Sequence, residues 1–455
     1  MNGAGRSYVR AAFAPVEPPP PAHGNAMSRF AASLFATPLN FAMTALSVGM
    51  ILLIVPPFLD FMIFDATWHG TSRADCLPNA GACWPFIKAK FGQFVYGFYP
   101  IDERWRPNLA FALGAALLTP LLIPSAPFKW LNSVLFFGVY PVVAFVLLTG
   151  GNLDLRNFFL GRFIDWQAAA GFGLAAGLRW TFWVDFFASA FVLTTLVLAG
   201  TMLLGASLRT AFVSCVTLFA SLGALLLAVD LDFGLRSVET HAWGGFLVTM
   251  VVAMTGIVVS LPLGILLALG RRSELPVVRF LSIVFIEFWR GVPVITVLFF
   301  ATYMLPLFLP SGVSFDTLLR ALIGVALFSA AYMAEVVRGG LQSIPRGQYE
   351  AASALGLGYW RTMSTVILPQ ALALVVPGIV NNFIGLFKDT TLVLIVAIFD
   401  LLGQLRASFS DPNWATPVTL YTGFAFAGIV YFVCCFAMSR YALFVERRVN
   451  VAGRR

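Results

Sequence analysis

The sequence predicts an all-α protein that crosses a membrane several times. Of its 455 residues, 59% are hydrophobic and only 11% are charged, and the mean hydropathy is +0.86. This composition lies far from that of a soluble globular protein, so lipid is expected to be the main solvent. A chain that crosses lipid must satisfy its backbone polar groups internally, which an α-helix does within one segment.

About ten apolar segments are long enough to cross a bilayer. A span needs about 20 apolar residues, because each residue adds about 1.5 Å to a hydrocarbon core roughly 30 Å thick. The segments lie near 39–63, 108–124, 131–149, 186–205, 210–229, 243–269, 280–308, 317–337, 371–397 and 420–444. Prolines interrupt the seventh segment, so we expect a broken helix there.

Basic residues in short loops predict the orientation, because such residues are retained in the cytoplasm. Most of them fall on one side of the ten segments: Arg6, Arg10, Arg29, Lys129, Arg209, Arg271, Arg272, Arg279, Arg338, Arg346, Arg361, Arg440, Arg447 and Arg448. Both termini are therefore expected in the cytoplasm, with residues 1–37 as a polar, disordered tail and 448–455 as a second tail. The net charge of +8 thus indicates orientation in a membrane and no nucleic-acid partner.

Two longer loops, 64–107 and 150–185, mix both charges and are rich in tryptophan and phenylalanine. They are expected to form extracytoplasmic structure at the lipid surface. Cys76 and Cys83 lie seven residues apart in the first loop. An oxidising compartment allows a disulfide between them, and the spacing alone leaves two free thiols equally open.

The chain divides near residue 240. The first part, residues 38–240, is predicted to be a membrane extension with about five spans and the two long loops. Few ionisable groups lie inside those spans. Residues 241–447 carry charges, glycines and prolines at membrane depth, together with one polar loop at 338–370 that is predicted to be cytoplasmic. An intramembrane charge is costly and usually has a role, so function is sought in this second part.

The 338–370 loop predicts two short helices, one over Gln348–Leu355 and one over Tyr359–Ile367. Ala351, Ala352 and Gly356 give the first helix small side chains, which allow the backbone of another protein to approach closely. The loop therefore looks like a docking element. The alternative is an amphipathic segment lying on lipid headgroups, although such helices usually place many basic residues opposite bulky hydrophobic ones.

The same loop resembles the coupling-loop signature of bacterial ABC importer permeases. The matching residues are Glu350, Ala351, Ala352, Gly356, Leu368 and Pro369, and Val366 stands where the family often has isoleucine. Three more stretches resemble the polar amino-acid subfamily, namely 287–293, 334–345 and 388–392. The whole chain is similar to the long permeases of general L-amino-acid and glutamate/glutamine/aspartate/asparagine importers, within the histidine/glutamine permease family.

This resemblance implies an inner-membrane permease subunit of an ATP-driven amino-acid importer. Its implied partners are a separate ABC ATPase that binds ATP and Mg, a sister permease, and a periplasmic amino-acid-binding protein. The chain itself has no Gly-x-x-x-x-Gly-Lys-[Ser/Thr] phosphate loop, so no cofactor is expected in it and hydrolysis is expected elsewhere.

Charged residues inside the predicted spans are the other candidates for function. Glu287 and Arg290 lie three residues apart, close enough to pair on one helix face. Lys388 and Asp389 follow Asn381 late in the ninth segment, where a zwitterionic amino acid would find partners of both signs. Two interpretations stay open for these residues: contact with the substrate path, or a charge network that locks helices together.

Two other classes of protein fit less well. An ion-coupled secondary transporter of amino acids is the main alternative, but no convincing inverted repeat is visible in the sequence. An intramembrane enzyme is disfavoured, because the chain has three histidines and neither a His-Glu-x-x-His nor a Gly-x-Ser-x-Gly motif.

Overall fold

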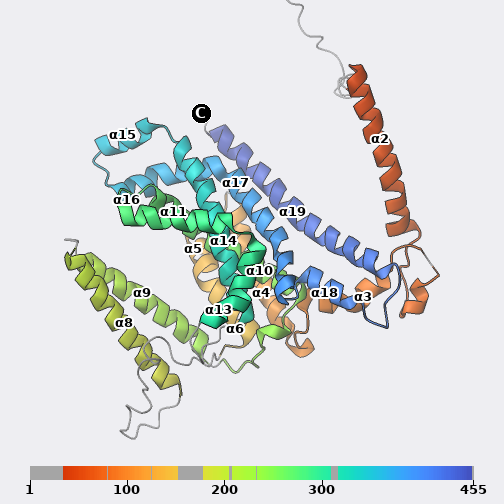
Figure 1. Ribbon diagram of the computed structural model, residues 1–455, viewed down its shortest axis with the longest axis horizontal. Coiled ribbons are helices and arrows are strands. Elements are labelled where there is room, and N and C mark those ends of the chain that lie inside the picture. The colour runs from red at the N-terminus through yellow and green to blue at the C-terminus, as the bar shows by residue number, and fades with distance from the viewer. Residues whose placement is uncertain are drawn as a thin grey trace, which may run out of the picture.

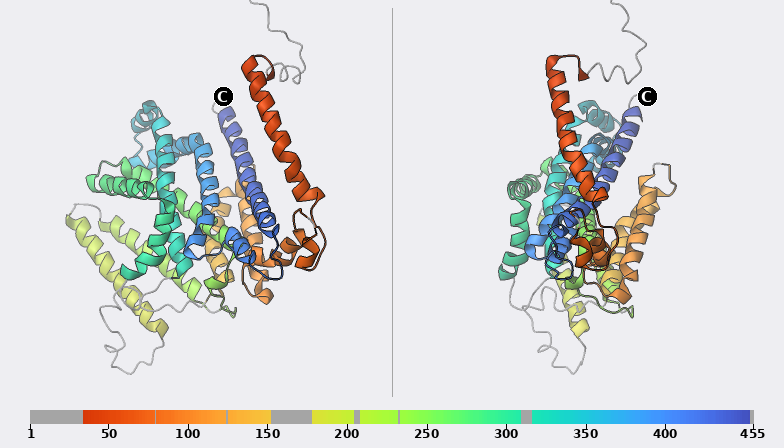
Figure 2. Two further views of the ribbon diagram at one scale, coloured as in Figure 1. Left: turned by 45° about the vertical axis from the view of Figure 1, so that its right-hand side comes forward. Right: turned by 90° about the vertical axis from the view of Figure 1, so that its right-hand side faces the viewer.

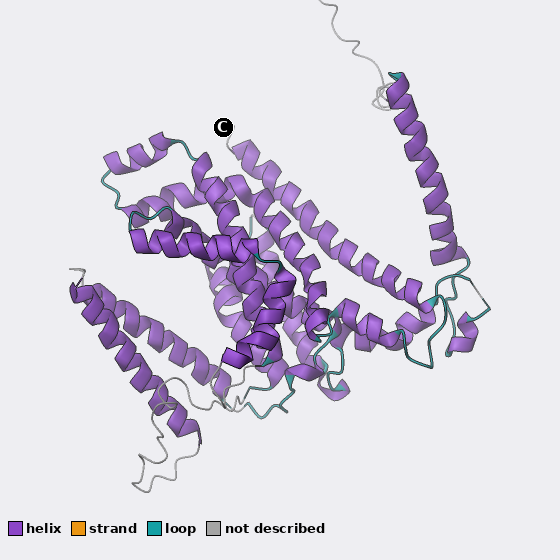
Figure 3. Ribbon diagram, viewed as in Figure 1, coloured by secondary structure: helices purple, strands orange, loops and turns teal. Residues whose placement is uncertain are grey.

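The computed structural model describes residues 34–78, 80–123, 125–151, 178–203, 208–231, 233–308 and 316–452. The described part consists of helices joined by loops (Figure 3). Residues 1–33 of the predicted tail and 152–177 of the predicted loop 150–185 lie outside these residues.

Seven described helices are long and apolar enough to cross a membrane, or eight if one bent pair counts as a span. The sequence predicted about ten segments, and each of them contains a described helix. The other two predicted segments lie on α4 (Trp105–Leu122) and α9 (Leu208–Asp230), which are not among these helices. Arg106 and Asn108 occupy the first turn of α4, and Ala211–Leu227 of α9 is apolar.

Helix α2 (Pro38–Leu59) begins the described chain and stands apart from the bundle (Figure 1). Thr37 caps it by accepting a hydrogen bond from the Asn40 N–H, and Pro38 occupies the first helical position, where no N–H is needed. No residue of α2 is buried, so its apolar surface is left for lipid or another chain. The π-helical turn η1 (Asp60–Phe64) continues it.

The rest of the N-terminal part contributes helices on two sides of the bundle. They are α3 (Trp84–Tyr96), α4, α5 (Lys129–Val134), the π-helical turn η4 (Leu135–Val139), α6 (Tyr140–Thr149), α8 (Leu178–Leu203) and α9. Helices α8 and α9 form a pair at the flank opposite α2 (Figure 1).

The centre of the bundle is built from α10 (Gly245–Arg271), α14 (Thr317–Ser343), α17 (Leu368–Asp389) and α19 (Thr419–Ala452). Helices α10 and α14 have the most extensive contact. Gly264 makes this possible, because a Cβ atom there would lie only 2.7 Å from the Met333 side chain. Buried residues from both sides of position 240, such as Leu148 and Leu247, share one apolar cluster, so the N-terminal part packs on the central bundle.

Helix α3 and its preceding loop pack against α18 (Leu401–Ser408) at one end of the bundle (Figure 1). Cys76, Cys83 and Phe86 share an apolar cluster with Leu405 and Trp414. Cys76 and Cys83 are joined in a disulfide, with Cα atoms 5.6 Å apart, so the structure shows the paired one of the two alternatives that the spacing left open.

The proline-interrupted segment is a helix pair with a sharp elbow. Helix α11 (Pro276–Gly291) ends just before Pro293. The second arm consists of α12 (Val294–Phe299), the π-helical turn η7 (Phe300–Met304) and α13 (Leu305–Phe308), and it makes an angle of 104° with α11. Val292 is extended, with φ −105° and ψ 133°, as the residue before a proline prefers. The expected proline break is therefore a single elbow at Val292 and Pro293.

The predicted docking loop lies at the end of the bundle opposite α3. Helix α15 (Arg346–Ala354), the short α16 (Tyr359–Arg361) and the π-helical turn η8 (Thr362–Ile367) form it, close to the boundaries that the sequence predicted. The start of α2 and the C-terminal end of α19 lie at this same end of the molecule (Figure 2).

Candidate functional site

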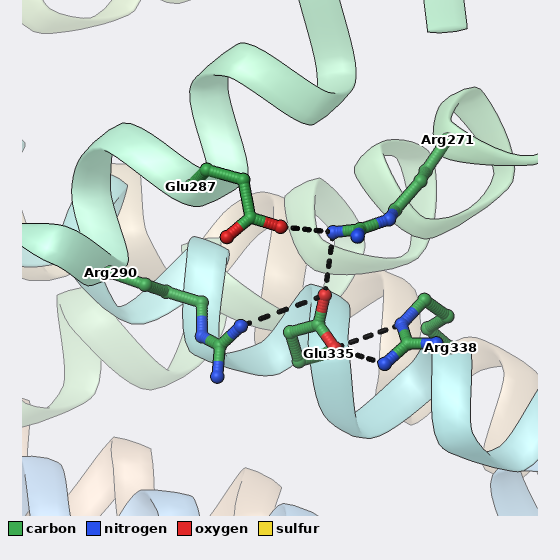
Figure 4. A network of polar contacts seen from close by, with 5 residues as sticks. All are labelled: Arg271, Glu287, Arg290, Glu335 and Arg338. Atoms are coloured by element: carbon green, nitrogen blue, oxygen red, sulfur yellow. Dashed lines mark hydrogen bonds and ion pairs between the residues drawn. The ribbon is translucent and has the colours of Figure 1, made fainter.

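Five charged side chains from three helices meet in one network of polar contacts (Figure 4). Arg271 is the last residue of α10, Glu287 and Arg290 belong to α11, and Glu335 and Arg338 belong to α14. We call these five residues the charge cluster. It contains three guanidinium groups and two carboxylates, so its formal charge is +1.

Glu335 is the centre of the charge cluster. Its Oε1 accepts a hydrogen bond from Arg271 Nη1 at 2.8 Å and lies 3.7 Å from Arg290 Nη1. Its Oε2 lies 2.8 Å from Arg338 Nε and 2.7 Å from Arg338 Nη2. The Glu335 side chain is only 15% exposed, so three cations keep a largely buried carboxylate paired.

Arg271 joins the two carboxylates, because its Nη1 also donates to Glu287 Oε1 at 2.9 Å. The elbow between α11 and α12 is thereby tied to both α10 and α14. Charge-assisted hydrogen bonds of this kind are short and directional, so they hold the end of α11 in one place.

The spacing of Glu287 and Arg290 allows a pair on one helix face, but in the described structure each has a partner on another helix. Glu287 pairs with Arg271, and Arg290 turns toward Glu335 with its guanidinium carbon 5.6 Å from the centre of the Tyr332 ring. Arg271 of α10 and Glu335 of α14 are the preferred partners, because the attraction between two charges on one exposed helix face is weak. Both residues nevertheless belong to one charge network, which is one of the two interpretations that stayed open.

Arg271, Glu335 and Arg338 were not among the predicted site residues. Arg271 and Arg338 were used to predict the orientation, and Glu335 and Arg338 belong to the family-like stretch 334–345. The spacing of Glu335 and Arg338, three residues apart inside an apolar helix, is the signal that was present. Nothing local in the sequence indicates that Arg271 reaches Glu335, which is 64 residues away.

The second predicted group lies apart from the charge cluster. Lys388 and Asp389 end α17, and Asn381 lies two turns earlier on the same helix. Within the described ranges, no ion pair or hydrogen bond connects these three side chains to the charge cluster. Lys388 and Asn381 are exposed, and Asp389 is half-buried.

The predicted docking residues lie on α15 and in the turn that follows. Glu350 and Ala351 are exposed, whereas Ala352 is buried against the molecule. Gly356 has φ +71°, a left-handed conformation that favours glycine, and a Cβ atom there would meet open space. Its N–H donates to Ser353 O at 2.9 Å, and the next N–H donates to Ala352 O at 3.1 Å, which ends the helix.

The remaining residues of the motif begin the next long helix. Leu368 is half-buried and Pro369 is exposed, and they occupy the first two positions of α17. Proline has no backbone N–H, and its absence costs no helical hydrogen bond in the first turn. The surface near α15 also exposes Leu355 and Trp360, with relative exposures of 79% and 69%. Large exposed apolar side chains beside small ones are typical of a surface that another molecule covers.

In the described ranges, no group of three or more His, Cys, Asp or Glu side chains could hold a metal ion. The long apolar helices define a multi-pass α-helical membrane protein with a charge cluster among its helices.

Comparison with known proteins gives the family. Residues 260–451 match the family of binding-protein-dependent transport system inner membrane components. The inner membrane amino-acid ABC transporter permease protein YhdY of Escherichia coli is 41% identical over 95% of this chain and 96% of its own length. The glutamate/glutamine/aspartate/asparagine transport system permease protein BztC of Rhodobacter capsulatus is 40% identical over 98% of each chain.

The chain belongs to the amino-acid ABC transporter permeases. A shorter relative, the probable glutamine ABC transporter permease protein GlnP of Bacillus subtilis, is 33% identical over 45% of this chain and 92% of its own length. Similarity to the two longer permeases, by contrast, includes the N-terminal extension as well as the region that the family model matches.

Proposed function

We propose that this chain forms the translocation path of an ATP-driven importer of polar amino acids in the bacterial inner membrane. The similarity to two amino-acid permeases over at least 95% of the chain supports this function more than any other observation. The chain performs no chemistry in this proposal. ATP and Mg are bound by a separate ABC ATPase, a periplasmic binding protein delivers the amino acid, and a sister permease completes the path.

The ATPase docks on the 338–370 loop. Glu350, Ala351 and Gly356 present small or polar exposed groups, and the open space above Gly356 leaves room for a partner. Ala352, which is buried, and Leu368, which is half-buried, anchor this segment to the bundle, and Pro369 lies exposed beside them. A loop that only rests on lipid headgroups is the alternative, and it would keep the same exposed Trp360 without binding the ATPase.

Both termini and the docking loop face the cytoplasm, and the α3 end faces the periplasm. The shared position of the described chain ends and α15 supports this orientation (Figure 2). The arginines of the short loops support it independently.

The charged groups divide into two roles. Glu287 and Arg290 act in the charge cluster, which positions the elbow of α11 and α12 next to the path. Asn381, Lys388 and Asp389 have no such partners in the described chain, so they are the better candidates to meet a zwitterionic substrate.

The decisive experiment is uptake by the purified, reconstituted complex with its ATPase and binding protein. Vesicles are loaded with MgATP or with a non-hydrolysable analogue, and a panel of labelled amino acids with acidic, amide, basic and apolar side chains is supplied outside. We expect uptake of polar amino acids only with hydrolysable ATP and without response to collapse of the proton gradient. Uptake that follows the proton gradient and ignores ATP would establish the ion-coupled alternative instead.

A further inference from the structure

Two adjacent arginines at the end of α10 point to different parts of the molecule. Arg271 enters the charge cluster, where it contacts Glu287 and Glu335. Arg272 is the C-cap of the same helix, and its Nη1 donates to Tyr349 Oη at 3.0 Å and to Leu341 O at 3.1 Å. One rigid helix end therefore touches both the charge cluster and the docking helix α15.

Tyr349 is held firmly on α15. Its ring packs against an apolar cluster that includes Leu341 of α14 and the following C-cap residue Ile344, and its hydroxyl also lies 3.4 Å from Leu341 O. The Arg272 guanidinium carbon lies 5.5 Å from the centre of the Tyr349 ring, which adds a cation–π contact. A displacement of α15 therefore acts on Arg272 through a hydrogen bond and a ring contact together.

The helix end that carries both arginines is tightly packed. Ala268 is fully buried, and a Cβ atom on Gly270 would lie only 2.3 Å from Ser282 Oγ on α11. Such close packing leaves little room for the helix end to deform separately from α11. A push on Arg272 is expected to move Arg271 with it, and Arg271 holds the elbow through Glu287.

We propose that Arg272 is a positioning residue that transmits the movement of the docking helix to the charge cluster, along the route Tyr349, Arg272, Arg271, and then Glu287 and Glu335. This inference rests on the proposed docking of the ATPase at α15. It adds a specific route to that function. Arg272 touches neither substrate nor nucleotide, and its effect is on coupling.

The test measures amino acid carried per ATP hydrolysed by the reconstituted complex with Arg272→Gln. We expect the ATPase to co-purify normally and to hydrolyse ATP, while the transport ratio falls about tenfold, which equals about 1.4 kcal/mol of lost coupling. Arg272→Lys keeps the charge but loses the planar fork, so it should recover part of the ratio. The matched control is Arg279→Gln, which removes an exposed arginine of α11 that forms no ion pair within the described part of the chain.

Tyr349→Phe provides a second variant that removes one oxygen atom and keeps the ring. It should lower the transport ratio, and combining it with Arg272→Gln should add little, because both changes break the same contact. A wild-type ratio in Tyr349→Phe or in Arg272→Gln overturns the route. Loss of ATPase binding by Arg272→Gln also overturns it, since Arg272 would then be a docking residue.

Failure of the underlying function gives a different result. If the unmodified complex shows no ATP-dependent uptake, the proposed function is wrong whatever the variants do. If the unmodified complex is coupled and the variants are coupled equally well, only the route through Arg272 is wrong.

Discussion

The backbone N–H of Cys83 donates a hydrogen bond to Thr422 Oγ1 at 2.9 Å, although the two residues are 339 positions apart. Cys83 belongs to the disulfide of the N-terminal extension, and Thr422 lies in the first turn of α19. A second polar contact, from Gln93 Nε2 to Gln404 Oε1 at 3.1 Å, joins α3 to α18. The extension is therefore bound to α18 and α19 by hydrogen bonds at this end of the bundle.

Thr422→Val tests this attachment, because it keeps the side-chain shape and leaves the buried Cys83 N–H without an acceptor. We expect a loss of about 1–3 kcal/mol in the free energy of unfolding, measured as a lower thermal midpoint of the complex in detergent. Thr119→Val is the matched control, because that hydroxyl is exposed and bonds only within its own helix, to Ala115 O. Equal midpoints for both variants would contradict the attachment.

The ion pair between Lys90 and Asp411 predicts a pH dependence of the same attachment. The hydrogen bond from Lys90 and that from the Asn413 N–H hold the pKa of Asp411 below its ordinary value. A lowered pKa stabilises the fold above the unfolded pKa, near pH 4, and that stabilisation is lost as the pH falls through the lower folded pKa. The pair is partly exposed, so its contribution is at most about 1 kcal/mol.

Measurements of the thermal midpoint from pH 7 to pH 3 in Asp411→Asn and the unmodified protein isolate this contribution. The difference between the two proteins should be constant above about pH 5 and shrink below pH 4. A difference that grows as the pH falls would have the wrong sign for this pair.

Glu335→Gln should damage the protein more than Glu287→Gln. The first change leaves three arginines around a neutral amide, whereas the second frees only one contact of Arg271. Breaking a buried pair costs about 3–5 kcal/mol, and the partial exposure of this site places the effect at the lower end. The effect is measured as a change in the thermal midpoint and in ATP-dependent uptake. Equal effects of the two variants would contradict the central role of Glu335 in the cluster.

Arg290→Gln and Asp389→Asn separate the two proposed roles. We expect both variants to assemble and both to lower uptake by about tenfold, an amount equal to about 1.4 kcal/mol. Arg290→Gln should act on all transported amino acids alike, because it loosens the elbow. Asp389→Asn should act through substrate affinity, and normal uptake by both variants would count against both roles.

Gly356→Trp should weaken ATPase docking or coupling. The left-handed φ of Gly356 disfavours any side chain, and a large ring would fill the space that we assign to the partner. Overpacking a tight contact costs about 1–3 kcal/mol, which weakens binding by roughly ten- to hundredfold. Co-purification of the ATPase and ATP-dependent uptake are both measured, on protein that reaches the membrane at normal abundance.

Two variants separate strain from bulk at this turn. Gly356→Asn introduces a residue that tolerates the left-handed conformation, so ATPase docking and uptake should remain near their normal levels. Gly358→Trp adds the same ring at an ordinary φ of −67°, in a position that is also open. Docking and uptake at unmodified levels in Gly356→Trp would show that the ATPase binds elsewhere.

Ser353→Cys reports which compartment holds α15. Ser353 is exposed on the helix, so a membrane-impermeant thiol reagent should label it from the cytoplasmic side alone. The experiment requires the natural cysteines to be replaced or blocked first. Labelling from outside intact cells would show that the orientation is the opposite one, with the termini in the periplasm.

The sequence by itself determined the helical membrane class, the elbow and the short helices of the 338–370 loop. Each depends on neighbours in the chain: apolar runs of span length, a proline that ends α11, and small residues followed by a glycine that ends α15. These signals are local, so the boundaries of α15 could be predicted closely. The span count was less certain, because the polar first turn of α4 shortens an apolar run that otherwise looks sufficient.

Only the tertiary structure decided how the charges are paired. Spacing suggested Glu287 with Arg290, but the fold brings Arg271 and Glu335 from other helices into better geometry. It likewise places Arg272 on Tyr349, 77 residues away, and leaves Lys388 outside the cluster. Ion pairs depend on distance and direction in space, and a periodic sequence pattern carries neither between separate helices.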